Sequence, residues 1–193
     1  MSRALIFASG LVRSETIAPY LKDSLIIAAD SGYRVCRSLE LIPHIGIGDF
    51  DSLTSEELRQ LRSLAPTFRY PPDKDHTDLE LALRWALDSQ ISSVVISGAL
   101  HSRFDHSLSA LLDAAPYEME ILFVEDDFKC LVLNASRPRI DFATAPQTWI
   151  SVFALHPETE LISRGLEWPL SWSQDPSVPW PRSQSNRCKN AGY

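Results

Sequence analysis

The most chemically suggestive segment of the chain is a turn with two aspartates one residue apart, Asp49 and Asp51, directly after the apolar segment 45–48. Side chains two residues apart on an extended chain point the same way, so these carboxylates should converge while Phe50 turns into the core. Converging carboxylates repel unless a cation lies between them, and their oxygens suit a hard cation such as Mg²⁺, which shares its coordination shell with water and substrate phosphates. The competing interpretation is a solvated turn, because Gly and Asp are common turn residues.

Similar polar groups recur beside other apolar segments, which favours a functional site over an isolated turn. The residues in these groups are Asp30 after segment 25–29, Lys74, Asp75 and Asp78 before a helix-like segment, and Gly98, Arg103, Asp105 and His106 after segment 94–96. In a doubly wound sheet, ligands bind outside the carboxyl ends of the strands, so these loops should meet at one edge. Taken singly, Asp78 can instead complement a helix dipole, and Arg103 with Asp105 can be a local ion pair.

The elements that must position these loops alternate between strand and helix. Short apolar runs typical of strands that are buried on both faces occur at 3–8, 25–29, 44–48, 94–96 and 121–124, with a weaker one at 67–70. Capping sequences that start at Thr54 and Thr77 each predict the beginning of a helix. The pattern therefore predicts a parallel, Rossmann-like α/β sheet over residues 1–127.

The C-terminal third of the chain has a different pattern. Strong helical periodicity is missing there, short β-like pieces occur at 130–133, 149–155 and 160–162, and prolines accumulate from Pro138 onward. We therefore expect a domain boundary near residue 127 and a smaller all-β domain over residues 128–193.

Composition restricts the class of protein. The chain has 193 residues, 45% of them hydrophobic and 22% charged, which is typical of a structured soluble protein. The net charge of -7 argues against nucleic acid or an anionic membrane as the main partner. Three widely spaced cysteines suggest neither a disulfide framework nor a zinc site. With no apolar run long enough to span a membrane and no signal-peptide pattern, we expect a cytoplasmic protein.

The usual phosphate-binding loops are missing from the sequence. There is no G-x-x-x-x-G-K-[ST] motif, and Gly46 and Gly48 are not followed by the third glycine of a dinucleotide-binding fingerprint. We therefore expect a nucleotide to be held through a metal ion, Lys74 and Arg103 more than through a glycine loop.

Taken together, the motifs resemble those of the thiamine pyrophosphokinases. The matching segments occur in the family's order and span nearly the whole chain: 29–32, 48–52, 74–78, 98–106, 165–170 and 185–186. The resemblance implies an α/β domain, a C-terminal β-sandwich, a homodimer, and Mg²⁺-dependent transfer of pyrophosphate from ATP to the hydroxyl of thiamine, with release of AMP. In such a dimer the active sites are shared at the interface.

The resemblance also assigns roles to residues. It implies a metal site at Asp49, Asp51 and Asp78, and catalytic roles for Asp51, Asp78, Lys74 and Arg103. It implies nucleotide contacts at Asp30, Asp75, Gly98, Arg103, Asp105 and His106. Thiamine contacts are implied at Ser185 and Asn186, with Trp168 either an aromatic wall of the pocket or part of the β-domain core.

Some residues depart from the family pattern. Ser31 stands where the family usually has glycine, and His101 and Ser102 stand where it has two glycines. Side chains at these positions could crowd the approach of a phosphate to the backbone. Two alternatives to the thiamine enzyme therefore stay open: the same transfer to another hydroxymethyl heterocycle such as a pterin, or a protein that binds nucleotide or thiamine without turnover. Either Asp78 or Asp105 could accept the proton of the substrate hydroxyl.

Overall fold

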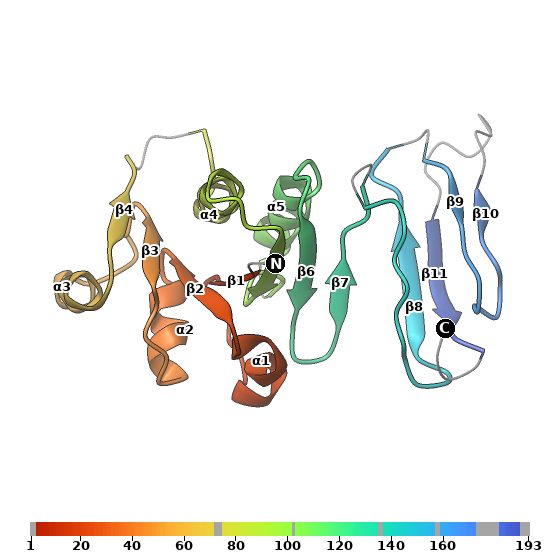
Figure 1. Ribbon diagram of the computed structural model, residues 1–193, viewed down its shortest axis with the longest axis horizontal. Coiled ribbons are helices and arrows are strands. Elements are labelled where there is room, and N and C mark those ends of the chain that lie inside the picture. Colours follow the sequence, from red (N-terminus) through yellow and green to blue (C-terminus); the bar gives the residue numbers. More distant parts are fainter. Residues whose placement is uncertain are drawn as a thin grey trace. The chain divides into compact units, whose positions relative to one another are not determined.

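The structure is a computed structural model that describes residues 3–71, 75–101, 103–134, 137–156, 159–172 and 182–189. The chain divides into two compact units, 1–138 and 139–193 (Figure 1). The expected boundary near residue 127 is wrong, because residues beyond it form a strand, β7 (Lys129–Leu131), that pairs antiparallel with β6 (Glu120–Val124). This hairpin keeps the segment up to Pro138 within the larger unit.

The larger unit is built on a seven-stranded sheet in the order β4-β3-β2-β1-β5-β6-β7. The other strands are β1 (Arg3–Phe7), β2 (Ser24–Ala29), β3 (Ile45–Gly48), β4 (Thr67–Arg69) and β5 (Ser93–Ser97). The strands β1 to β6 pair in parallel, which confirms the expected parallel α/β sheet. The strand order reverses between β1 and β5, so the loops that follow these two strands diverge at a topological switch point.

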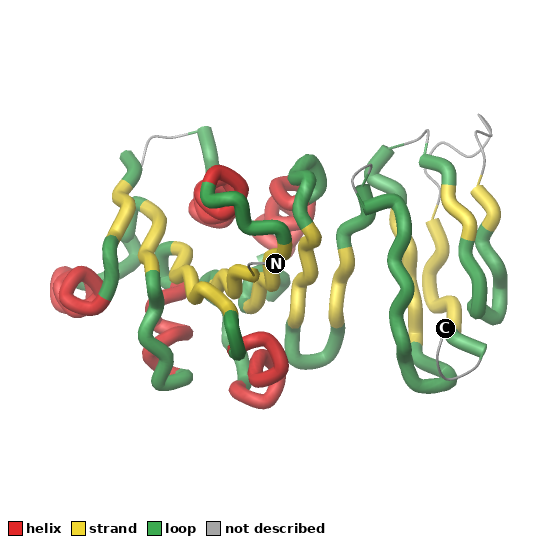
Figure 2. Tube along the Cα trace, in the orientation of Figure 1, coloured by secondary structure: helices red, strands yellow, loops and turns green. Residues whose placement is uncertain are grey.

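Helices cover both faces of this sheet, as Figure 2 shows. They are α1 (Ser14–Leu21), α2 (Gly32–Ser38), α3 (Ser55–Leu64), α4 (Asp78–Asp88) and α5 (Phe104–Ala114). Alternate residues of β1 point to opposite faces: Ile6 belongs to an apolar cluster with residues of α4 and α5, and Leu5 to a second cluster with residues of α1, α2 and α3. This two-sided burial explains why the strands read as continuous apolar runs.

The two expected helix starts are present. At α3, Oγ1 of Thr54 accepts a hydrogen bond from the backbone N–H of Glu57, and the carboxylate of Glu57 accepts one from the N–H of Thr54. At α4, Oγ1 of Thr77 accepts a hydrogen bond from the N–H of Glu80. These caps fix where the helices begin, directly after the loops that carry the acidic residues.

Among the described residues of the smaller unit, two antiparallel sheets of two strands each are present. One pairs β8 (Trp149–Phe153) with β11 (Arg182–Arg187), and the other pairs β9 (Leu161–Ile162) with β10 (Ser171–Trp172). Residues of β8 and β9 pack on one apolar cluster, whose buried members are Leu166, Leu170 and Cys188. The expected fold class, an α/β sheet unit followed by a small β unit, is therefore confirmed. Within the described segments, no helix combines the length and apolar character that crossing a membrane requires.

Candidate active site

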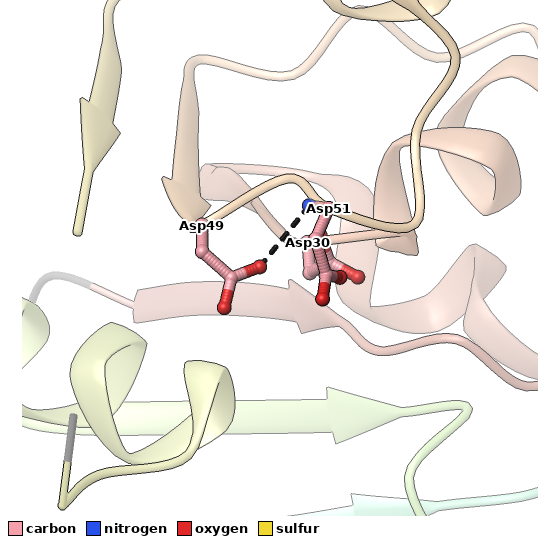
Figure 3. A group of neighbouring side chains, drawn as sticks. All are labelled: Asp30, Asp49 and Asp51. Atoms are coloured by element: carbon pink, nitrogen blue, oxygen red, sulfur yellow. Dashed lines mark hydrogen bonds between the residues drawn. The ribbon is translucent and has the colours of Figure 1, made fainter. Parts of the chain in front are cut away.

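Three aspartates gather at the carboxyl edge of the sheet. Asp30 follows β2, while Asp49 and Asp51 follow the neighbouring strand β3. One carboxylate oxygen from each lies within 4.8 Å of the other two (Figure 3). Asp49 is buried, Asp30 is partly buried and Asp51 is exposed, so the group opens toward solvent on one side.

The turn itself brings Asp49 and Asp51 together. Phe50 adopts a left-handed backbone conformation, with φ of 60°, and its side chain is only 3% exposed within the apolar cluster that contains Leu5. The inward position of Phe50 and the convergence of the two carboxylates are as predicted, but the extended backbone assumed for them is wrong. A positive φ is uncommon for a residue without a glycine's freedom, and here burial of the phenyl ring offsets its cost.

Asp30 completes the group from the next strand. Its φ is 47°, its backbone N–H donates to the carbonyl of Ile47 at 2.8 Å, and its Oδ2 accepts a hydrogen bond from the hydroxyl of Ser52. Its other oxygen, Oδ1, is buried and has no hydrogen-bond partner in the part of the chain that the structure describes. A buried carboxylate oxygen without a partner is costly unless a cation approaches it. Three carboxylates with such an oxygen fit a hard divalent cation.

Asp78, the remaining predicted metal ligand, lies beside this group. A Cβ atom on Gly48 would come within 3.0 Å of Oδ1 of Asp78 and 3.2 Å of the Cα atom of Asp30. Gly48 also has a φ of 148°, so a side chain there would strain the backbone as well. The first residue of α4 thus packs closely over the end of β3, although Asp78 is not one of the three clustered carboxylates.

A cavity of about 160 Å³ lies at the switch point between β1 and β5. Its lining residues are Ser9 and Gly10 after β1, Gly98, Ala99, His101 and Arg103 after β5, and His106 in α5. The loops are joined by a hydrogen bond of 2.8 Å from the N–H of Gly10 to the carbonyl of Gly98. Three residues predicted to contact the nucleotide, Gly98, Arg103 and His106, therefore surround one cavity.

Arg103 precedes α5 and forms a two-point ion pair with Asp105. The distances are 3.2 Å from Nε to Oδ1 and 2.5 Å from the second nitrogen to Oδ2, and both side chains are exposed. The hydrogen bond from Arg103 holds the pKa of the Asp105 carboxyl below its ordinary value. A lower pKa makes the Asp105 carboxylate a weaker base, so it is a poorer proton acceptor than a carboxylate of higher pKa.

The structure adds less about the other residues singled out in the sequence. Lys74 and Ser102 lie outside the described residues. Asp75 is exposed in the loop before α4. Ser31, expected to crowd the backbone, has right-handed helical angles, so the position does not require a glycine.

The two predicted thiamine contacts in the smaller unit differ in kind. Asn186 is only 1% exposed, and its amide is used internally: Oδ1 accepts from the N–H of Trp168 at 3.2 Å, and Nδ2 donates to the carbonyl of Trp168 at 2.6 Å. Ser185 is exposed and lies at an irregularity of β11, with φ of 55°. The side chain of Trp168 is 55% exposed, so its interpretation as a core residue is wrong.

The sequence analysis missed Ser9 and Gly10, which line the cavity. It also missed Glu125, which binds the cavity loop that follows β5. Glu125 lies in an acidic run, 125–127, that reads as a solvated turn. Its position could have indicated a role in the site, because Glu125 directly follows β6, the strand that pairs with β5.

These features define a doubly wound α/β protein with an oxygen-ligand site at the carboxyl edge of its sheet. The sequence profile described as "Thiamin pyrophosphokinase, catalytic domain" matches residues 19–121, more than half of the chain. The chain belongs to the thiamin pyrophosphokinase family.

Individual relatives agree with this membership. The chain is 41% identical to the thiamine pyrophosphokinase of Bacillus subtilis over 86 residues, which cover 44% of this chain and 40% of the relative. The chain thus spans about two fifths of the length of that curated relative. A solved thiamin pyrophosphokinase family protein from Enterococcus faecalis is 26% identical with a TM-score of 0.72, over 97% of this chain and 90% of that one. The thiamin pyrophosphokinase of Candida albicans shares the fold, with 15% identity and a TM-score of 0.74 over 98% and 83% of the two chains.

Proposed function

We propose that this protein transfers pyrophosphate from ATP to the hydroxyl of thiamine, giving thiamine diphosphate and AMP. The observation that carries the proposal is the cluster of Asp30, Asp49 and Asp51 at the carboxyl edge of the sheet, in a chain of this family. Relatives named thiamine pyrophosphokinase support the choice of reaction.

The proposed cofactor is Mg²⁺, held by Asp49, Asp51 and Asp30, with Asp78 beside them. When bound, the ion neutralises charge on the polyphosphate and joins an acidic site to an anionic substrate. Asp49 is fixed by the N–H of Asp51, which donates to its Oδ1 at 3.1 Å. The cluster is therefore held in shape by the turn before any ligand binds.

The remaining polar residues have positioning and charge roles in this proposal. Pyrophosphoryl transfer needs alignment and charge neutralisation more than covalent chemistry from the protein. Arg103, at the cavity, and Lys74 supply positive charge for the phosphates. Asp75, Asp105, Gly98 and His106 contribute to the nucleotide site. Asp78 is the better candidate for the proton acceptor, because the ion pair with Arg103 lowers the pKa of Asp105.

We assign thiamine recognition to the smaller unit. Thiamine combines a flat aminopyrimidine with a cationic thiazolium ring, which suits polar edge contacts and an aromatic face. Exposed Ser185 and Trp168 offer these groups, while Asn186 supports the backbone of Trp168. We further propose a cytoplasmic homodimer in which the smaller unit of one subunit completes the site of the other.

An assay of AMP release tests the proposal. The protein is incubated with ATP and Mg²⁺ alone, with thiamine, and with a hydroxymethylpterin, and products are identified by mass. AMP and thiamine diphosphate formed only with thiamine, and lost with a chelator, are the expected result. Product from the pterin alone would favour the other heterocycle, and binding of ATP without product would favour a non-catalytic protein.

A further inference from the structure

Glu125 is a buried carboxylate that binds the wall of the switch-point cavity. It follows β6 and is only 5% exposed. Its Oε1 accepts hydrogen bonds from the backbone N–H groups of Ala99 at 3.0 Å and Leu100 at 2.9 Å, and its Oε2 accepts one from Gly98 at 3.2 Å. The ring nitrogen Nδ1 of His101 lies 3.2 Å from Oε2.

Three consecutive backbone N–H groups that converge on one point form a nest that binds anions. Nests of this kind usually bind phosphates, but here the protein's own carboxylate occupies the nest. Burial of a carboxylate is costly unless its hydrogen bonds are satisfied, and charge-assisted bonds to N–H groups are strong. Glu125 therefore has a well-satisfied position that an apolar side chain could not reproduce.

The next residue, Asp126, binds the start of α1, beyond the loop that forms the opposite wall. Oδ1 of Asp126 accepts hydrogen bonds from the hydroxyl of Thr16 at 2.7 Å and from the backbone N–H of Arg13 at 3.3 Å. These residues lie at the start of α1, just beyond Ser9 and Gly10. Two successive carboxylates after β6 thus hold the two loops that diverge at the switch point.

The occupied nest also affects which ligand group can enter the cavity. The N–H groups of residues 98–100 are already donated to Glu125, so they are not available to a phosphate. A buried negative charge lies behind them, and like charges disfavour each other more strongly in a poorly solvated site. Beside residues 98–100, the uncharged nucleoside part of a nucleotide is therefore favoured over its phosphates. The phosphates are better matched by Arg103, elsewhere on the cavity lining, and by a cation at the aspartates after β2 and β3.

We propose that Glu125 is a positioning residue for the nucleotide: it holds loop 98–101 in shape and closes the nest to phosphate, so that the nucleoside lies in the switch-point cavity. This inference rests on the proposed function for the identity of the nucleotide. The effect of Glu125 on the loop and on the choice of ligand does not depend on catalytic turnover.

The test compares Glu125→Ala with Glu120→Ala, which removes the same charge from the exposed amino end of β6. Glu125→Gln, which keeps one acceptor oxygen, serves as a milder variant if the alanine form does not fold. Hydrogen exchange at the amides of Gly98, Ala99 and Leu100 is measured first. We expect exchange to become about tenfold faster or more in Glu125→Ala, since these three amides lose their charged acceptor. Acetate should slow it again by filling the nest.

Binding and kinetics complete the test. Wild type should bind adenosine without Mg²⁺ and without competition from inorganic phosphate, whereas Glu125→Ala should lose adenosine affinity and gain phosphate binding. In turnover, KM for ATP should rise about tenfold while KM for thiamine and kcat change little. Unchanged exchange at residues 98–100, equal rises in both KM values, or phosphate competition in wild type would overturn the inference. If wild type makes no thiamine diphosphate, the proposed function fails, but the exchange and adenosine measurements still decide the role of Glu125.

Discussion

The backbone N–H of Asp51 donates a hydrogen bond of 3.1 Å to Oδ1 of Asp49 (Figure 3). In the turn after β3, the backbone of Asp51 therefore fixes the side chain of Asp49. This bond leaves the carboxylate of Asp51 exposed and outside the apolar core. The side chain of Asp51 is therefore available for metal binding and contributes little to folding.

The first prediction follows from that exposure. Asp51→Asn should lower transfer activity by at least about a hundredfold, because loss of one metal-binding carboxylate removes charge stabilisation from the transferred group. The melting temperature should stay close to that of wild type. Activity assays beside thermal melts measure both, with Asp127→Asn, an exposed aspartate after β6, as the control. Near wild-type activity of Asp51→Asn would contradict the metal role.

The second prediction concerns the packing of Asp78 over β3. Gly48→Ala should destabilise the fold by about 1–3 kcal/mol, because the new methyl group meets Asp78 and the backbone at Asp30 while φ stays at 148°. Activity should also fall, since both neighbours belong to the proposed site. Gly46→Ala in the same strand is the comparison: its nearest contact, at 2.9 Å, is the end of the flexible Leu61 side chain. Chemical denaturation that shows a smaller loss for Gly48→Ala than for Gly46→Ala would contradict this account.

The third prediction is a dependence of stability on pH. Glu57 accepts two hydrogen bonds from Arg34, and Arg34 also donates to the carbonyl of Ser52 at 2.8 Å. This ion pair therefore stabilises the turn that contains Asp51. Hydrogen bonds from Arg34, and then from the N–H of Thr54, lower the pKa of Glu57 from 4.5 to about 2. Because the folded-state pKa is depressed, this stabilisation is fully present above about pH 4.5 and is lost as the pH falls toward 2.

Glu57→Gln should therefore be less stable than wild type at neutral pH, and its stability should fall less steeply between about pH 5 and 2. Urea denaturation at a series of pH values measures the difference. Glu56→Gln, one residue away and exposed, is the control. Parallel stability curves for wild type and Glu57→Gln across this window would show that the ion pair does not couple folding to protonation.

Much of the fold could be predicted because its causes are local. The strands of the parallel sheet are apolar along their whole length, and the caps at Thr54 and Thr77 mark two helix starts. The domain boundary was missed because β7 is an edge strand of only three residues, too short to show a clear periodicity in the sequence. Its pairing with β6 is visible only in the structure. The place of Asp30 in the acidic cluster depends on the pairing of β2 with β3, which the sequence does not encode locally.

The polar residues of the site were harder to assign, because residue type does not reveal the partner. Asn186 reads as a ligand contact, yet the structure uses its whole amide to hold the backbone of Trp168. Glu125 reads as part of an exposed acidic run, yet it is buried against three N–H groups. Both roles arise from contacts between segments far apart in the sequence.

The fourth prediction separates support from recognition in the smaller unit. Asn186→Ala should destabilise this unit by about 1–3 kcal/mol, because it leaves buried backbone groups of Trp168 without partners. Trp168→Ala and Ser185→Ala should leave stability nearly unchanged and raise KM for thiamine about tenfold, with KM for ATP constant. Melting curves and steady-state kinetics with each substrate varied distinguish the cases. A stable Asn186→Ala protein with a selective loss of thiamine affinity would mean that Asn186 contacts the substrate directly.

The last prediction tests the proposed homodimer with shared sites. The Asp51→Asn subunit lacks a metal ligand, and the Trp168→Ala subunit lacks the proposed aromatic face for thiamine. If each site combines the larger unit of one subunit with the smaller unit of its partner, a mixed dimer contains one site with both defects and one intact site. An equimolar mixture should then recover about a quarter of wild-type activity at low thiamine, because about half of randomly reassorted dimers are mixed. Mass spectrometry of differently tagged subunits confirms exchange, and a mixture of Asp51→Asn with Asp127→Asn controls for the dilution of active subunits. Exchange without recovery beyond the sum of the two separate activities would place each site within a single subunit.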